Sequence, residues 1–229
     1  MRQRMVLIVL IASLGLASGC EPPVIDGGKD MAYLTDQEEP NDAQGEPLLP
    51  LTPGNTWTMD ALSAKKRAED RLRAIGPIAL GPEKGTLVEI QRDGRVWRRE
   101  AYRVEKDEAY LLGFGEAQQP LLALNPPLRL FRVPAKVGEY VSWNGTITVK
   151  NSRYRAVGFS RVSNREDLST TAGRFVTYRI DTVLSILNAG KPTHFPTIRW
   201  LAPGIGFVKR GYADEGNPAL AELKRFSVH

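Results

Sequence analysis

Reactive side chains are scarce in this sequence, which has one cysteine and two histidines. The cysteine, Cys20, follows Arg2, Arg4 and an apolar run over residues 5–17 that ends in small residues, which is the composition of an export signal. The run is shorter than the roughly 20 apolar residues that a membrane-spanning helix needs. A thiol at this place predicts a covalent modification of the chain. It therefore indicates where the protein is located and not which reaction it catalyses.

The stretch Leu16-Ala17-Ser18-Gly19-Cys20 resembles the lipobox of bacterial lipoprotein precursors. The resemblance implies that residues 1–19 are a signal peptide that is removed, and that Cys20 is acylated as the mature N-terminus. Ala17 departs from the pattern, in which Leu is commoner. The alternative is an ordinary signal peptide beside a free cysteine. An acylated Cys20 leaves no thiol for a disulfide, a nucleophile or a metal site.

The other candidates for catalysis do not form a recognisable site. His194 lies between two prolines on a predicted surface loop, and no G-x-S-x-G segment accompanies it. Gly204-Ile205-Gly206 lacks the third glycine and the following helix of a dinucleotide-binding fingerprint. A carboxylate pair that folding brings together stays open as a route to hydrolysis. We expect no catalytic residue, no cofactor and no metal site.

Residues 20–49 are rich in acids and turn formers, and Lys29 is their one cation. Because this composition cannot bury enough surface to fold, we interpret them as an acidic flexible linker that carries the lipid anchor. Residues 50–229 are then a single, basic, β-rich domain. Its positive charge favours lipid headgroups or an acidic protein as partner, or is simply a solvated surface. Nucleic acid is not expected, because an anchored envelope protein rarely meets it.

Alternation of apolar and polar residues predicts antiparallel strands over most of this domain. Asp93-Gly94 and Asn144-Gly145 are predicted as two-residue hairpin turns, and the first would pair Ile90 with Trp97. The later strands are predicted at Phe175–Leu187, Thr197–Leu201, Ile205–Arg210 and Ala221–Val228. No crossover helices separate them, so we expect a mainly β fold with a curved antiparallel sheet or incomplete barrel.

One short helix is predicted over Asp60–Ile75, where Asp60 can cap the first turn. Its apolar side chains recur at helical spacing: Leu62, Ala68, Leu72 and Ile75. The opposite face is basic, which fits a surface helix packed on the sheet or a helix lying on a membrane.

The strand Phe175–Leu187 carries a wide apolar stripe on one face. The stripe consists of Val176, Tyr178, Ile180, Leu184 and Ile186. A single short helix could cover only part of it, so the stripe is the candidate face for an apolar ligand; packing as core is the alternative.

Three short segments, in this order, carry a resemblance to a known family. They are Pro50-Leu51 with Gly54–Trp57, Thr171–Phe175 and Trp200–Lys209. Together they resemble exported bacterial proteins and lipoproteins grouped as a domain of unknown function. Such proteins are similar in architecture to lipoprotein-localisation carriers, in which a curved antiparallel sheet forms an incomplete barrel. The resemblance implies export and architecture, and brings no activity or catalytic residue.

These observations favour an envelope lipoprotein without enzymatic activity that binds a hydrophobic ligand or another envelope component. A structural or assembly accessory without a ligand cavity is the alternative, and a hydrolase with a carboxylate pair is the third hypothesis. Glu21 follows Cys20, where Asp retains lipoproteins in the inner membrane of some bacteria. We therefore expect the outer membrane, with the protein facing the periplasm. The sequence does not indicate an oligomeric state.

Overall fold

The computed structural model describes residues 46–63, 66–149, 152–188, 191–214 and 217–229. The chain divides into two compact units, residues 1–40 and 41–229, and every described residue belongs to the second. Cys20, the signal peptide and most of the predicted linker lie outside the described residues. No helix in this part of the chain is long and apolar enough to cross a membrane.

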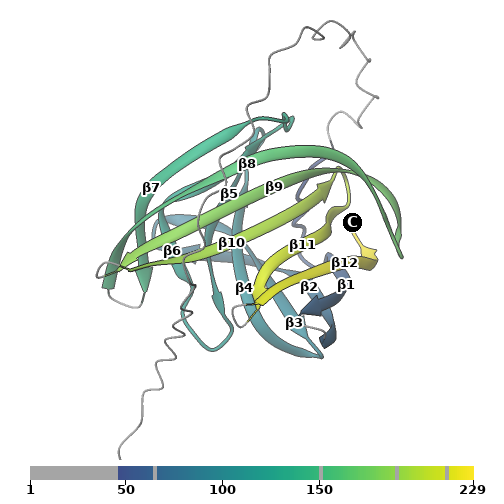
Figure 1. Ribbon diagram of the computed structural model, residues 1–229, viewed down its shortest axis with the longest axis horizontal. Helices are drawn as coiled ribbons and strands as arrows, with labels where there is room; N and C mark the ends of the chain where they lie inside the picture. Colours follow the sequence, from purple (N-terminus) through teal and green to yellow (C-terminus); the bar gives the residue numbers. More distant parts are fainter. Residues whose placement is uncertain (1–45, 64–65, 150–151, 189–190, 215–216) are drawn as a thin grey trace, which may run out of the picture. The chain divides into compact units, whose positions relative to one another are not determined.

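The described residues form a closed barrel of antiparallel strands (Figure 1). Each strand pairs with the next one along the chain, and β1 pairs with β12 to complete the circle. The strands are β1 (Thr56–Ser63), β2 (Lys66–Leu80), β3 (Glu83–Arg92), β4 (Arg95–Val104), β5 (Glu108–Glu116), β6 (Leu122–Arg132), β7 (Tyr140–Val149), β8 (Ser152–Thr170), β9 (Gly173–Asn188), β10 (Lys191–Ala202), β11 (Gly206–Asp214) and β12 (Asn217–Ser227). The predicted antiparallel β class is confirmed. The sheet is closed, however, which leaves no free strand edge.

The predicted helix over Asp60–Ile75 is wrong. These residues form the end of β1 and most of β2, and the described residues contain no helix. In β2, Asp70, Leu72 and Ala74 are buried while the residues between them are exposed, which is the two-residue period of a strand. Pairing with β1 and β3 along β2 outweighs a weak local helical preference.

The predicted turn at Asn144-Gly145 is also wrong, because both residues lie inside β7. They pair there with Val157 and Ala156 of β8, and the two strands are joined further along, between Val149 and Ser152. Glycine is required at position 145 because β6 and β7 approach each other closely there, and not because the chain turns. The sequence Asn-Gly occurs both in turns and at such close approaches, so it does not distinguish them.

The predicted turn at Asp93-Gly94 is confirmed, and it joins β3 to β4. Both residues have positive φ, 49° and 80°, as a two-residue hairpin turn of this kind requires. A register shift follows Ile90, so that Ile90 pairs with Arg98 and not with Trp97. The expected pairing is therefore displaced by one residue, because a bulge adds a residue on β4.

The later strands lie where the alternation places them. Phe175–Leu187 falls inside β9, and the predicted pair of strands near Pro203-Gly204 corresponds to β10 and β11. The last predicted strand corresponds to β12, although the strand ends at Ser227. β10 begins earlier than predicted and contains His194, so the predicted loop around this residue is wrong.

Residues 46–55 precede β1 and pack beside the turn between β10 and β11. Leu48 and Leu49 are buried and belong to the core. The backbone N–H of Gly204 donates a hydrogen bond to the carbonyl oxygen of Pro47 at 3.0 Å. The Asn55 side chain donates to the carbonyl oxygen of Pro50 at 2.8 Å. This segment is thereby fixed to the barrel before the first strand begins.

Candidate functional site

The stripe predicted on β9 faces the interior of the barrel. Ile180, Leu184 and Tyr178 are 0%, 2% and 8% exposed and belong to the core, while Val176 and Ile186 are half-buried. Other strands therefore cover most of the stripe. Contact of these residues with a ligand stays a prediction.

The interior also holds a buried carboxylate, that of Glu100 on β4. Its Oε1 accepts hydrogen bonds from Arg210 Nη2 at 2.7 Å and from Arg98 Nε at 2.8 Å, and its Oε2 accepts one from the Tyr102 hydroxyl. Arg98, Glu100 and Tyr102 are two residues apart along β4, so they share one face of the strand. Arg210 comes from β11, which is not a neighbour of β4 in the sheet. The cluster therefore crosses the barrel.

Arg199 of β10 is a third guanidinium beside the same carboxylate, and it is 1% exposed. Its Nη2 lies 3.7 Å from Oε2 of Glu100, an ion pair without a hydrogen bond. Its Nε donates to the Tyr102 hydroxyl at 3.1 Å, and its Nη1 lies 3.5 Å from Oγ1 of Thr182. One carboxylate is thus surrounded by three guanidinium groups.

The electrostatics of this cluster favour its charged state. Burial opposes ionisation of Glu100, but the positive charges of Arg210, Arg98 and Arg199 outweigh it and hold the pKa of the carboxyl well below its usual range. Burial raises the pKa of Tyr102 to about 12, so its hydroxyl stays protonated and can donate. A carboxyl with so low a pKa is a poor general acid or base near neutral pH. The ion pairs of the cluster therefore link strands across the barrel, and its charge state does not favour acid–base chemistry.

A second buried carboxylate, Asp70 of β2, has its own partners. Arg92 Nε donates to Oδ1 at 2.8 Å, and the Tyr212 hydroxyl donates to Oδ2 at 2.6 Å. Burial, followed by the hydrogen bond to Asp70, raises the pKa of Tyr212. This network ties β2 and β3 to β11, so ion pairs as well as apolar contacts hold opposite parts of the barrel together.

Two hollows accompany these groups. A groove of about 910 Å³ lies beside residues 46–52, and its wall mixes apolar and basic side chains. They include Leu49, Leu51, Val104, Lys84, Arg103 and His229. A much smaller cavity lies inside, next to Arg98 and Arg199. The groove has the size of a small-molecule pocket, whereas the interior has no comparable space among the described hollows.

His194 forms a pair with Ser185, its register partner on β9. Its Nδ1 lies 2.7 Å from Oγ of Ser185, and the ring is exposed, as predicted for a surface histidine. In the described part of the chain no carboxylate contacts this histidine, so the orienting group of a catalytic triad is missing there. The described residues also contain no group of three or more His, Cys, Asp and Glu side chains that could hold a metal ion.

Sequence reasoning missed the Glu100 cluster. The sequence predicts a basic surface for the domain and no buried arginine, because Arg is far more often exposed than buried. The alternation of Arg98, Glu100 and Tyr102 is a signal that all three share one face. Only the closed barrel shows that this face is the interior.

The fold places the chain among barrel proteins of antiparallel strands. The chain is similar to a solved structure of a candidate lipoprotein from Parabacteroides distasonis, with 12% identity and a TM-score of 0.51 over 80% of this chain and 99% of that one. It also matches an exported protein of Bacteroides fragilis with a YmcC-like fold, at 13% identity and a TM-score of 0.45, over 78% of this chain and 98% of that one. The hypothetical lipoprotein YmcC of Escherichia coli matches at 10% identity and a TM-score of 0.35, over 77% and 86%.

At 12% identity the similarity to the Parabacteroides structure shows a shared fold alone and says nothing about activity. No protein-family model matches the chain, and no curated protein matches it either. The comparisons therefore show the fold and assign no function to the chain.

Proposed function

We propose that the chain is a lipid-anchored protein of the bacterial envelope, held to the membrane by an acyl group at Cys20, and that its barrel is an assembly accessory that binds another envelope protein. The outer membrane, with the barrel facing the periplasm, is part of the proposal because Glu21 follows Cys20. The similar structure from Parabacteroides distasonis is described as a candidate lipoprotein, which supports this location.

The filled interior is the observation that carries the assembly role. Ile180 and Leu184, expected to line a ligand cavity, pack against the core, and the charged cluster of Glu100 occupies further interior space. An acyl chain needs a wide apolar cavity, and the cavity beside Arg199 is about the size of one water molecule. We therefore place binding of the partner on the outside of the barrel.

The outer surface offers an apolar strip that consists of Leu62, Leu220, Gly211 and Ile198. Leu62 and Leu220 are register partners, 50% and 44% exposed. A Cβ built at Gly211 would contact both Ile198 and Leu220, so the strip is continuous across β12 and β11. Exposed apolar side chains that adjoin one another and are rimmed by polar residues are typical of interaction sites.

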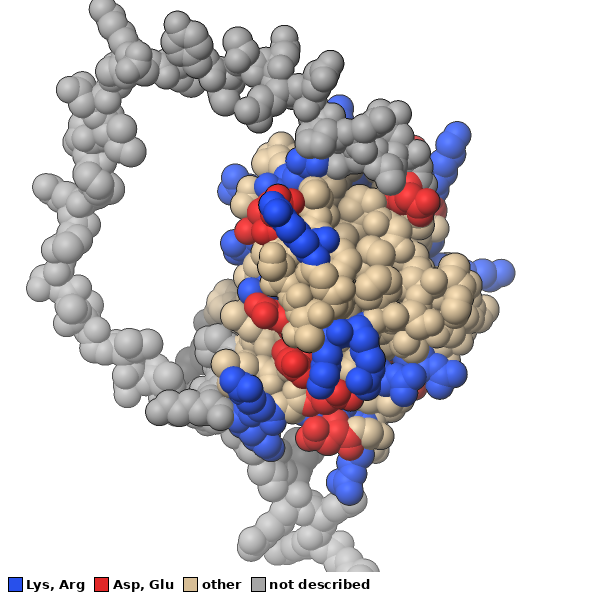
Figure 2. Space-filling view, turned by 90° about the vertical axis from the view of Figure 1, so that its right-hand side faces the viewer, with Lys and Arg blue, Asp and Glu red and all other residues tan. Residues whose placement is uncertain are grey.

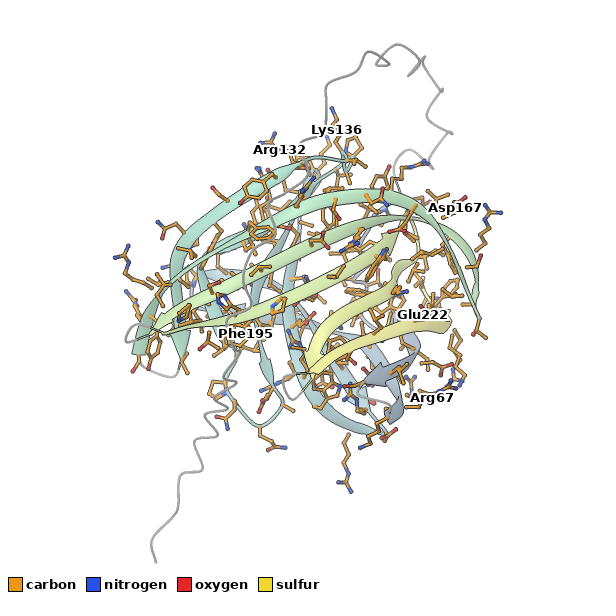
Figure 3. The ribbon with its side chains drawn as sticks, viewed as in Figure 1. Arg67, Arg132, Lys136, Asp167, Phe195 and Glu222 are labelled. Carbon is orange, nitrogen blue, oxygen red and sulfur yellow. The ribbon has the colours of Figure 1, made fainter. Side chains whose placement is uncertain are left out.

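Paired charges border the strip. Lys209 and Glu222 are 2.6 Å apart, and Lys224 and Asp60 are 3.4 Å apart. Arg67 pairs in register with Leu62, and Figure 3 shows Arg67 and Glu222 on the same side of the barrel. Figure 2 shows that basic and acidic side chains lie beside one another on this side of the molecule, around areas without charge. An apolar centre with a polar rim is the composition of a protein–protein interface.

Photo-crosslinking in cells tests the partner. A photoreactive amino acid at position 220 should form discrete adducts with envelope proteins, and Leu62→Glu in the same chain should abolish them. The same amino acid at exposed Thr193 on β10 is the control and should give none. Equal crosslinking at both positions, or none at position 220, contradicts the assembly role.

Two further measurements test the anchor and the rival function. Cys20→Ala should move the protein from the membrane fraction to the soluble fraction, because acylation needs the thiol. Native mass spectrometry of protein purified without delipidation should show the mass of the acylated polypeptide with no further lipid bound. A co-purified lipid would instead favour the carrier hypothesis, with the groove beside residues 46–52 as its site.

A further inference from the structure

Arg199 carries a buried positive charge that its surroundings satisfy only in part. Its closest approach to the Glu100 carboxylate is 3.7 Å, which is too long for a hydrogen bond. A guanidinium has five N–H donors, and Arg199 directs two of them at the hydroxyl groups of Tyr102 and Thr182. Since a buried cation that is only partly neutralised is costly, a further acceptor is favoured at this place.

The charge around Glu100 is unbalanced in the same direction. Arg98, Arg199 and Arg210 all face this one carboxylate. Asp70, the other buried acid, does not correct the imbalance, because it is paired with Arg92. The cluster therefore has an excess of positive charge, of which Arg199 holds the part that is least neutralised.

A small cavity lies beside Arg199. Its polar wall comes from Arg98, Arg199, Thr182 and Thr197, and no carboxylate belongs to its lining. The two threonines are 2% and 6% exposed, so bulk water competes little for their hydroxyl groups. The rest of the wall is apolar and consists of Leu111, Phe114, Leu184 and Phe195. The cavity is thus lined by two cations and two threonines, without an acid to neutralise the cations.

The size of the cavity limits what it can hold. It offers about 10 Å³ to the centre of a molecule the size of water. That is room for about one such molecule. A phosphate or sulfate group, with four oxygens around a central atom, is too large, and so is a carboxylate with its two oxygens and carbon, whereas a single halide ion comes closest to the available size.

We propose that this cavity binds one small monovalent anion such as chloride, with Arg98 and Arg199 as its charged ligands and Thr182 and Thr197 in its wall. The anion brings one negative charge into a site that lacks one. The bound anion completes the interior of the barrel and is independent of any partner on the outer strip.

Thermal unfolding at constant ionic strength tests this site. The purified protein is unfolded in sodium gluconate, whose anion is too large for the cavity, and gluconate is then replaced stepwise by chloride or by acetate, which is also larger than one water molecule. A saturable rise of the unfolding temperature with chloride and not with acetate identifies a bound monatomic anion. Equal unfolding temperatures in gluconate and chloride, or equal rises with chloride and acetate, overturn the proposal.

Three variants separate binding from a merely structural role. Thr197→Val and Thr182→Val keep the shape of the side chain and remove one hydroxyl, and each should weaken anion affinity several-fold. Arg98→Gln should weaken it at least tenfold. Arg174→Gln, which removes a side chain that is 73% exposed and paired with Asp167, is the control and should leave affinity unchanged.

The deciding quantity is the difference between unfolding temperatures in chloride and in gluconate. A structural role alone lowers both temperatures equally and leaves this difference at its wild-type value, which overturns the proposal even when a variant is unstable. Loss of the difference in Arg98→Gln and the threonine variants, with its retention in Arg174→Gln, supports it. Isothermal titration with chloride gives the affinity directly for those variants that remain folded.

Discussion

Gly145 of β7 lies so close to Asn125 of β6 that a Cβ built at the glycine would stand 2.5 Å from the Asn125 carbonyl oxygen. The same Cβ would stand 2.7 Å from a ring carbon of Trp143. Strands β6 and β7 share only a short pairing, which ends where Asn125 meets Thr146. Glycine allows the strands to approach each other at this point.

We therefore predict that Gly145→Val destabilises the barrel by about 1–3 kcal/mol, the usual cost of forcing extra methyl groups into a packed site. Urea denaturation measures the free energy of unfolding. Ser142→Val, at an exposed position of the same strand, is the control and should stay within about 0.5 kcal/mol of wild type. An unchanged midpoint for Gly145→Val would show that the strands are not in contact here.

The hairpin between β3 and β4 gives a second prediction. Gly94 has a φ of 80°, and a β-branched side chain resists this conformation. Gly94→Val should therefore lower the free energy of unfolding by about 1 kcal/mol or more. Asp93→Asn should have little effect, because Asn also tolerates positive φ. Equal stability of Gly94→Val and wild type would contradict the turn.

Local pattern predicted the strands better than it predicted how they connect. The strand predicted over Phe175–Leu187 is confirmed in β9, where Tyr178, Ile180 and Leu184 are buried. Its polar face is less exposed than the pattern suggests, because Thr177 and Ser185 are 0% and 8% exposed. Asp93-Gly94 and Asn144-Gly145 are alike in sequence, and only the first is a turn. The difference comes from Asn125, a residue of another strand, which no local window contains.

Barrel closure and the charged interior were beyond the sequence for a similar reason. Closure depends on the pairing of β1 with β12, between residues at opposite ends of the domain. Arg199 and Arg210 are buried because Glu100 on β4 meets them across the barrel. Sequence composition assigns such arginines to the surface, and only the long-range contact reverses that assignment.

The Glu100 cluster leads to a prediction on pH. The folded-state pKa of Glu100 lies below the ordinary value of 4.5, so its ionised form stabilises the fold above pH 4.5, and this stabilisation is lost as the pH falls below that value. Glu100→Gln should cost about 3–5 kcal/mol at pH 7, because it leaves Arg210 and Arg199 buried without their partner.

Urea denaturation between pH 7 and pH 3 measures this dependence. The difference in unfolding free energy between wild type and Glu100→Gln should shrink as the pH falls through the window below 4.5. Glu222→Gln, in an exposed pair with Lys209, should change stability by less than about 1 kcal/mol and show no such trend. A constant difference between wild type and Glu100→Gln would contradict the assigned charge state.

Ile180 decides between a packed core and a ligand-binding face. Its side chain is 0% exposed, so Ile180→Asp places an unpaired carboxylate in the core and should prevent folding. Ile180→Val, which removes one methyl group, should cost about 0.5–1.5 kcal/mol. Thr193→Asp, at an exposed position of β10, is the matched control for the added charge and should fold normally.

Circular dichroism and urea denaturation measure the stability of these variants, and uptake of an apolar fluorescent dye by folded wild-type protein tests for a ligand-binding face. We expect no uptake, because the core around Ile180 is filled. Dye uptake by wild type together with a folded Ile180→Asp variant that has lost it would restore the apolar-ligand hypothesis for β9.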